Sequence, residues 1–154
     1  MEPPDRFSIF EFLDAEYRFF SFRQTRDMSN AEYLETFQRY FEPYEQLGGN
    51  LGLGDKIIEG FVDAEDPDAI TAAEWEAGKA KAREHHLGHW LIRNSDPHRY
   101  GSLRADLKNF HARGINKYPE TLIQAYEMLV NYVDPNRGRN QQERSTGRRR
   151  CGGR

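Results

Sequence analysis

The clearest structural signal in the chain is the stretch DPHRYGSLRADLKNFHARG, residues 96–114. Asp96 followed by Pro97 is typical of a helix start, with a capping carboxylate and then proline at the first helical position. Large apolar residues then recur at spacings of three and four: Tyr100, Leu103, Leu107 and Phe110. Gly114 is suited to end the helix. The stretch therefore predicts an amphipathic helix that packs one side against other helices.

Two capping boxes mark the starts of further helices. Ser29 and Glu32 have the spacing in which the hydroxyl accepts a hydrogen bond from the third amide while the glutamate reaches back. Thr71 and Glu74 repeat this spacing. The helix that begins at Ser29 is predicted to end at Gly48-Gly49. Its predicted core side is aromatic: Tyr33, Phe37, Tyr40, Phe41 and Tyr44.

An N-terminal helix is predicted from about Asp5 to Thr25. Its core side is predicted from residues at helical spacing: Phe7, Phe10, Leu13, Tyr17 and Phe20. Phe12, Phe19 and Phe22 fall elsewhere around the same helix. The helix is thus either buried on two sides or offers an exposed aromatic strip to a partner. Periodicity does not choose between these alternatives.

The remaining segments complete a helical pattern. A short helix is expected within 53–61, an exposed acidic linker over 63–68 and a long helix over 71–91. A last helix is expected to start at Pro119 and to end near Asp134-Pro135. Its predicted buried side consists of Leu122, Ala125, Tyr126, Leu129, Val130 and Val133. Six helices without strand alternation indicate an all-α fold.

Charge divides the chain at about residue 136. Residues 1–136 carry 24 acidic and 15 basic side chains, whereas residues 137–154 carry seven arginines and one glutamate. Because this tail has no apolar residue to anchor it, we predict that it is disordered and binds polyanions. The arginines expected to contact nucleic acid are Arg137, Arg139, Arg144, Arg148, Arg149, Arg150 and Arg154. The expected organisation is a helical domain over 1–136 and a basic tail over 137–154.

Catalytic motifs are missing from the sequence. It contains no P-loop, dinucleotide-binding glycine fingerprint, nucleophile elbow or CxxC pair, so we expect no enzymatic activity and no cofactor. His85 and His89 are four residues apart and could seat a divalent metal, but no third ligand accompanies them. The favoured interpretation is that these histidines, with His86, lie on a helix surface beside a buried Trp90. Carboxylate pairs such as Glu74 and Glu76, or Asp66 and Asp68, are expected to be solvated.

Composition also bears on location. No apolar run approaches the roughly 18 residues that a membrane span needs, and the start MEPPD lacks the basic-then-apolar order of a signal peptide. Cys151 is the single cysteine and cannot form an internal disulfide, which is consistent with a reducing compartment. We therefore expect a cytoplasmic protein without a membrane partner.

Two stretches carry more specific motifs. The first has YRFFSFRQ at 17–24, MS at 28–29, EY at 32–33, Phe37 and EQLGG at 45–49. The second has RYGSL at 99–103, DLKN at 106–109, Gly114, YPETL at 118–122, AY at 125–126 and LVNY at 129–132. Together they resemble the capsid region of Gag proteins from copia-type retrotransposons, over about residues 17–132.

The resemblance implies a helical, capsid-like unit that self-associates into a shell around RNA. In this family a zinc knuckle usually follows the capsid region. Cys151 stands where a knuckle would begin, but Arg154 occupies the position of its second cysteine. A complete knuckle, and a zinc ion held by one, are therefore not expected here. The alternative function is a host protein-interaction module derived from Gag that does not package nucleic acid.

Overall fold

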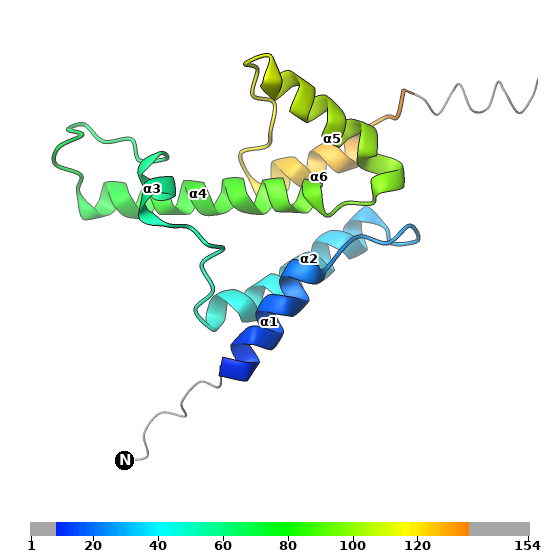
Figure 1. Ribbon diagram of the computed structural model, residues 1–154, viewed down its shortest axis with the longest axis horizontal. Coiled ribbons are helices and arrows are strands. Elements are labelled where there is room, and N and C mark those ends of the chain that lie inside the picture. Colours follow the sequence, from blue (N-terminus) through cyan, green and yellow to red (C-terminus); the bar gives the residue numbers. More distant parts are fainter. Residues whose placement is uncertain (1–8, 136–154) are drawn as a thin grey trace, which may run out of the picture.

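The computed structural model describes residues 9–135, and within this range the chain forms six helices and no β-strand. The helices are α1 (Ile9–Ser21), α2 (Asn30–Gln46), α3 (Asp55–Glu59), α4 (Ala72–Arg93), α5 (Pro97–Ala112) and α6 (Leu122–Asn131) (Figure 1). The predicted all-α fold is confirmed. Phe7, Cys151 and the seven tail arginines lie outside the described residues, so the predictions that concern them stay predictions.

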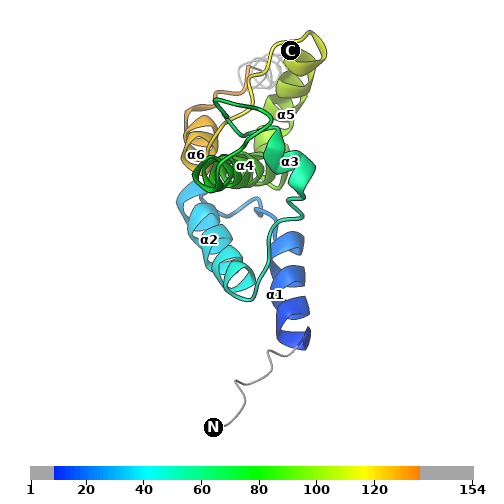
Figure 2. The same ribbon diagram turned by 90° about the vertical axis from the view of Figure 1, so that its left-hand side faces the viewer.

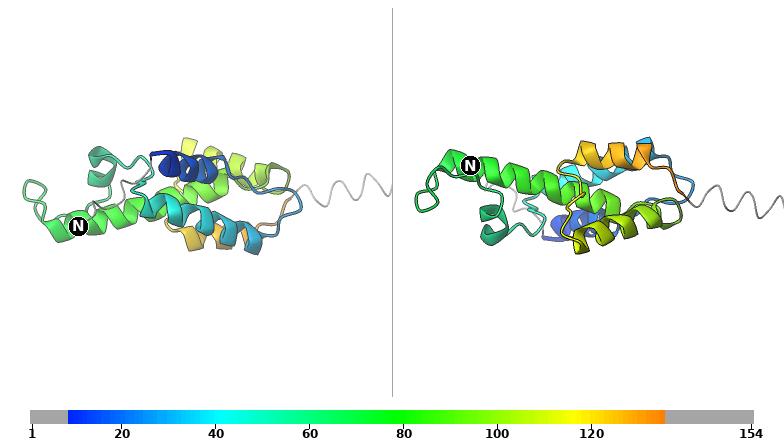
Figure 3. Two further views of the ribbon diagram at one scale, coloured as in Figure 1. Left: turned by 90° about the horizontal axis from the view of Figure 1, so that it is seen from below. Right: turned by 90° about the horizontal axis from the view of Figure 1, so that it is seen from above.

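The long helix α4 is the centre of the arrangement. Figure 2 looks nearly along it and shows α1 and α2 on one side, with α5 and α6 on the other. The views in Figure 3 agree, since α1 and α2 cover α4 from below and α5 and α6 cover it from above. No helix within residues 9–135 combines the length and apolar character needed to cross a bilayer.

Local capping chemistry sets the helix starts. The Ser29 hydroxyl accepts from the Glu32 amide at 3.2 Å, and the Thr71 hydroxyl accepts from the Glu74 amide at the same distance. Both predicted capping boxes are complete. The last helix differs from its prediction because it begins at Leu122 rather than at Pro119. Its N-cap is Thr121, whose hydroxyl accepts from the Gln124 amide at 3.1 Å and thereby fixes the first turn.

The predicted core side of α1 is correct for Phe20, which packs partly buried against the core, and wrong for three other residues. Phe10, Leu13 and Tyr17 are 74%, 48% and 76% exposed, whereas Phe19 is fully buried. The aromatic side of α2 explains this choice of face. The Phe19 ring lies between aromatic rings of that helix, with centroid distances of 5.1 Å to Phe37, 5.2 Å to Phe41 and 5.7 Å to Tyr44. Three other aromatic residues of this region pack partly buried against the same core: Phe12, Phe20 and Phe22.

The predicted buried side of α6 is correct in part. Leu122, Ala125 and Leu129 are buried, and Tyr126 is half-buried. Val130 and Val133 are 52% and 81% exposed, which corrects the prediction for these two residues. Val130 is turned about 100° around the helix from Leu129, and Val133 follows the end of the helix. Only one side of α6 therefore packs against α4.

A buried polar junction ties the α1–α2 connection to the end of α4. The backbone N–H of Gln24 donates to the backbone carbonyl of Asn94 at 2.9 Å. The side-chain oxygen of Gln24, Oε1, accepts from the backbone N–H of Asp96 at 3.0 Å. Gln24 Nε2 also donates to Asn30 Oδ1 at 3.0 Å. Because these groups are buried, losing one partner would leave the other unsatisfied. The junction holds the neighbouring Arg23 against the C-terminal part of α4.

Candidate nucleic-acid interface

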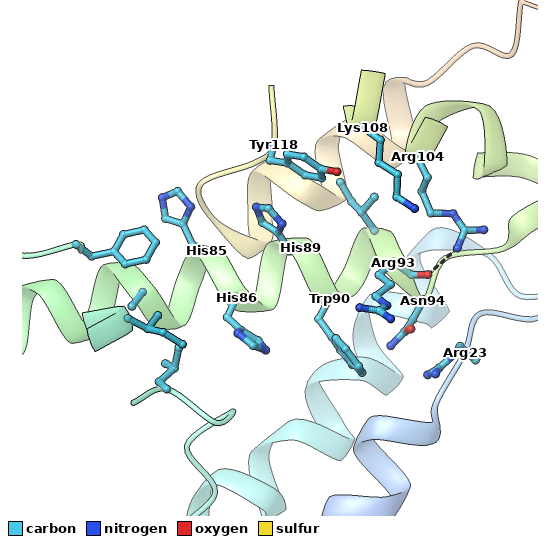
Figure 4. Close-up of a pocket in the computed structure, with 15 residues that line it drawn as sticks. Arg23, His85, His86, His89, Trp90, Arg93, Asn94, Arg104, Lys108 and Tyr118 are labelled. Carbon is cyan, nitrogen blue, oxygen red and sulfur yellow. Dashed lines mark hydrogen bonds between the residues drawn. The ribbon is translucent and has the colours of Figure 1, made fainter. Parts of the chain in front are cut away.

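A cleft of about 750 Å³ lies along α4. Its walls come from the α1–α2 connection, the α3 region, α4, α5 and the segment before α6, as Figure 4 shows for the side chains. Its volume is typical of clefts that bind small organic ligands. Five separate parts of the chain thus meet at one concave surface.

The cleft is strongly basic. Arg23, Arg93, Arg104 and Lys108 line it, and none of its 15 lining residues is an aspartate or a glutamate. None of these four cations forms an ion pair with any residue in the range 9–135. The cleft therefore concentrates positive charge on a body in which acidic residues outnumber basic ones.

Neutral backbone groups hold two of the cations in place. One Arg23 nitrogen, Nη1, donates to the carbonyls of Phe20 at 2.7 Å and Phe22 at 2.9 Å. Arg104 Nη1 donates to the carbonyl of Arg93 at 2.7 Å, across the α4–α5 junction. These bonds fix the guanidinium groups without neutralising their charge, so the side chains remain available to an anion.

Aromatic side chains stand among the cations. The guanidinium carbons of Arg23 and Arg93 lie 5.9 Å and 5.6 Å from the Trp90 ring centroid. His89 stacks on Tyr118 with centroids 4.3 Å apart and planes 16° apart. These flat surfaces and the cations together provide the two kinds of group that bind single-stranded nucleic acid, namely stacking faces and phosphate partners.

Two histidines of the cleft, His86 and His89, favour their neutral form. Burial lowers the pKa of His86, and it lowers the pKa of His89 together with the nearby His85, His86 and His111. Protonation of His86 or His89 would add charge to a surface that is already positive. An anion bound in the cleft would oppose this effect and stabilise the protonated rings.

Two buried donors in the cleft lack acceptors. Asn94 is 2% exposed, and its Nδ2 has no hydrogen-bond partner among the described residues. The buried Trp90 Nε1 also lacks one. Both residues line the cleft, and Figure 4 shows Asn94 beside Arg93, Trp90 and Arg23. Unpaired buried donors are costly, and acceptors from a ligand would satisfy them if a local shift of this wall exposed the two atoms.

The metal alternative finds no support in the geometry. Within residues 9–135 there is no group of three or more His, Cys, Asp or Glu residues placed to hold a metal ion. The His85 ring instead packs on Phe61 with centroids 4.7 Å apart, and His89 packs on Tyr118. The expectation that Trp90 beside these histidines is buried is corrected, since its side chain is half-buried.

One member of each carboxylate pair that was expected to be solvated has a local structural role. Glu74 completes the capping box of α4, and Asp66 accepts from the backbone amide of Asp68 at 3.0 Å. Glu76 and Asp68 are exposed.

Sequence reasoning did not find the basic cleft, because its cations come from distant segments. One signal was nevertheless present. Residues 85–117 contain all five histidines, and they carry six lysines and arginines against two aspartates. A basic, histidine-rich segment inside an acidic body marks a candidate anion site.

Comparisons with protein-family models, with curated proteins and with solved structures find no match to this chain.

Proposed function

We propose that the protein is a structural, non-enzymatic subunit similar to the Gag proteins of copia-type retrotransposons. In this proposal it acts in the cytoplasm, self-associates through helix faces and binds RNA through its Arg-rich segment 137–154. The all-helical body and the charge of that segment agree with such a role.

The exposed apolar side of α1 carries this proposal. Ile9, Phe10, Leu13 and Tyr17 lie at helical spacing and are all exposed. The opposite side of the helix is fixed by the packing of Phe19 against α2, so the exposed side is presented on a rigid support. Clustered exposed apolar residues of this kind mark interaction surfaces.

A second apolar face on α6 supports assembly beyond a single contact. Ile123 and Val130 of α6 are exposed, as is Val133 just after the helix, and α6 lies on the other side of α4 from α1 (Figure 2). Two faces that point in different directions allow one subunit to contact two neighbours. Shells require such repeated contacts.

Light scattering of the full chain over a concentration series tests the proposal. We expect dimers or larger species, and we expect Phe10→Gln combined with Tyr17→Gln to shift them to monomer. Glutamine favours the helix and removes the apolar contact. Ile115→Gln is the matched control, because Ile115 is an exposed apolar residue outside both faces.

The outcomes separate the two candidate roles. Circular dichroism should show the same helix content in all variants, so that a change in mass reports the interface. A wild-type chain that stays monomeric at high concentration, with and without RNA, would contradict the capsid-like role and favour the interaction-module alternative.

A further inference from the structure

We propose that the basic cleft along α4 binds a nucleotide of single-stranded nucleic acid, with its phosphate on the cations and its base against the aromatic rings. This goes beyond the function proposed above, because it places a binding site on the folded body rather than in the tail. It stands whether or not the chain self-associates.

Charge identifies the anionic part of the ligand. Arg23 and Arg104 come from different segments, yet both act electrostatically on the buried Tyr33 hydroxyl, so their charges lie close to the same point. Arg93 and Lys108 line the same cleft, which no carboxylate lines. Four like charges without counter-charges repel one another, and a bound anion would relieve this repulsion. Guanidinium forks fit phosphate oxygens particularly well.

Two unpaired hydrogen-bond donors beside the cleft indicate that its ligand carries acceptors. Trp90 Nε1 and Asn94 Nδ2 are both donors, and neither meets an acceptor among residues 9–135. Phosphate oxygens and base carbonyls are acceptors. Because both atoms are buried in the unbound protein, a ligand with acceptors would pair with them after a local shift of this wall, whereas a cationic or donor-rich ligand would leave them unpaired.

The remaining walls distinguish a nucleotide from a simple anion. Leu53, Ile57 and Phe61 line the cleft with apolar side chains, and the stacked His89 and Tyr118 line it as well. Inorganic phosphate has no surface to place against these groups, whereas a base has a flat face. Bases are accessible for stacking in single strands and not in duplexes.

Trp90 gives the site its own spectroscopic readout. The chain contains two tryptophans, and Trp75→Phe leaves Trp90 as the only one. The two positions are about 22 Å apart along α4, so Trp90 emission reports the cleft. Binding confined to residues 137–154 would raise the anisotropy of a labelled strand without a base reaching Trp90.

The experiment titrates full-length Trp75→Phe protein with an oligouridylate of about six nucleotides, a length within the usual site size for single strands. We expect the strand to quench Trp90 emission. Arg93→Gln combined with Lys108→Gln should weaken this binding by about tenfold, which corresponds to about 1.4 kcal/mol. Lys79→Gln is the control, because Lys79 is an exposed cation of α4 outside the cleft.

Each other outcome would overturn the assignment. Unchanged Trp90 emission while anisotropy shows binding would place the strand on the tail alone. Equal quenching by inorganic phosphate would define an anion site without base recognition, and equal affinity for uridine monophosphate would define a site for free nucleotides. An equal loss of affinity in Lys79→Gln would mean that only overall charge matters.

Discussion

Gly88 determines how closely the segment before α6 approaches α4. A Cβ atom at this position would lie 2.8 Å from the Thr121 carbonyl oxygen and 3.2 Å from its carbon. Both atoms belong to the backbone, so relief would require moving the segment that begins α6 and carries Tyr118. The absence of a single methyl group at Gly88 therefore positions a wall of the cleft.

We predict that Gly88→Ala lowers the free energy of unfolding by about 1–3 kcal/mol, because overpacking outweighs the better helix propensity of alanine. Urea denaturation provides the measurement. Gly101→Ala is the control, since Gly101 lies within α5 and a Cβ there meets no atom within 4 Å. That variant should be as stable as wild type or more stable by up to about 1 kcal/mol. Equal stability of both variants would show that the backbone adapts at Gly88.

Two histidines of α4, His86 and His89, make the cleft sensitive to pH. His86 and His89 have pKa values below the ordinary value, so they are neutral at pH 7 in the free protein. A nearby phosphodiester favours their protonated forms and raises both pKa values in the complex. Binding then takes up protons, and affinity rises as pH falls.

We predict that binding of the oligouridylate, followed by Trp90 emission, strengthens as pH falls from about 7.5 to about 5.5, the range around the ordinary histidine pKa. A phosphodiester is the suitable probe because its charge does not change over this range. His86→Gln combined with His89→Gln should flatten the pH profile. The control is His98→Gln, which should leave the pH profile unchanged because His98 is exposed on α5 and does not line the cleft. A flat wild-type profile would exclude these histidines from the site.

The elements also show how far the sequence alone could lead. The starts of α2, α4 and α5 were predictable because Ser29, Thr71 and Asp96 cap their helices through hydrogen bonds within three residues. The buried side of α1 was not predictable from the sequence, because Phe10 and Phe19 belong to two different apolar sides of the helix and both sides have helical spacing. Only the packing surface of α2 decides between them, and that surface is a tertiary property.

The candidate site depends on the same distinction. The histidine pair at 85 and 89 could be read from the sequence as one helix face. The cluster of cations could not be read in this way, because Arg23 is brought to Arg93 by long-range contacts. Among them are the hydrogen bonds of Gln24 with Asn94 and Asp96, which are 70 and 72 residues away. Long-range polar contacts of this kind leave no periodic signal.

Opposite charges occupy different regions of the chain. The body has an excess of acidic residues, yet positive charge gathers in the α4 cleft and in the sequence of residues 137–154. Nucleic acid is therefore expected to meet two attractive regions on a chain whose net charge is −3. Salt should weaken each region in proportion to the phosphates that it contacts.

We predict that binding of a long single strand to the full chain weakens with salt at a log–log slope near −0.7 per phosphate contact. Replacing Arg148, Arg149 and Arg150 by serine should make the slope shallower by about 2, and Arg93→Gln with Lys108→Gln by about 1.4. Fluorescence anisotropy at several salt concentrations measures both. A slope that the tail substitutions leave unchanged would remove residues 137–154 from the interaction.

The uneven covering of α4 has a consequence for local stability. Its 22 residues extend over about 33 Å, but Gly78 and Ala82 are its only buried residues before Leu87. Backbone amides near Ala72 should therefore exchange with deuterium much faster than those near Leu91, although both belong to one continuous helix. The cleft lies over the slowly exchanging end. Ligand binding would therefore slow deuterium exchange in the part of α4 where exchange is already slow. Exchange near Ala72 should stay the same with and without ligand, so it provides an internal reference.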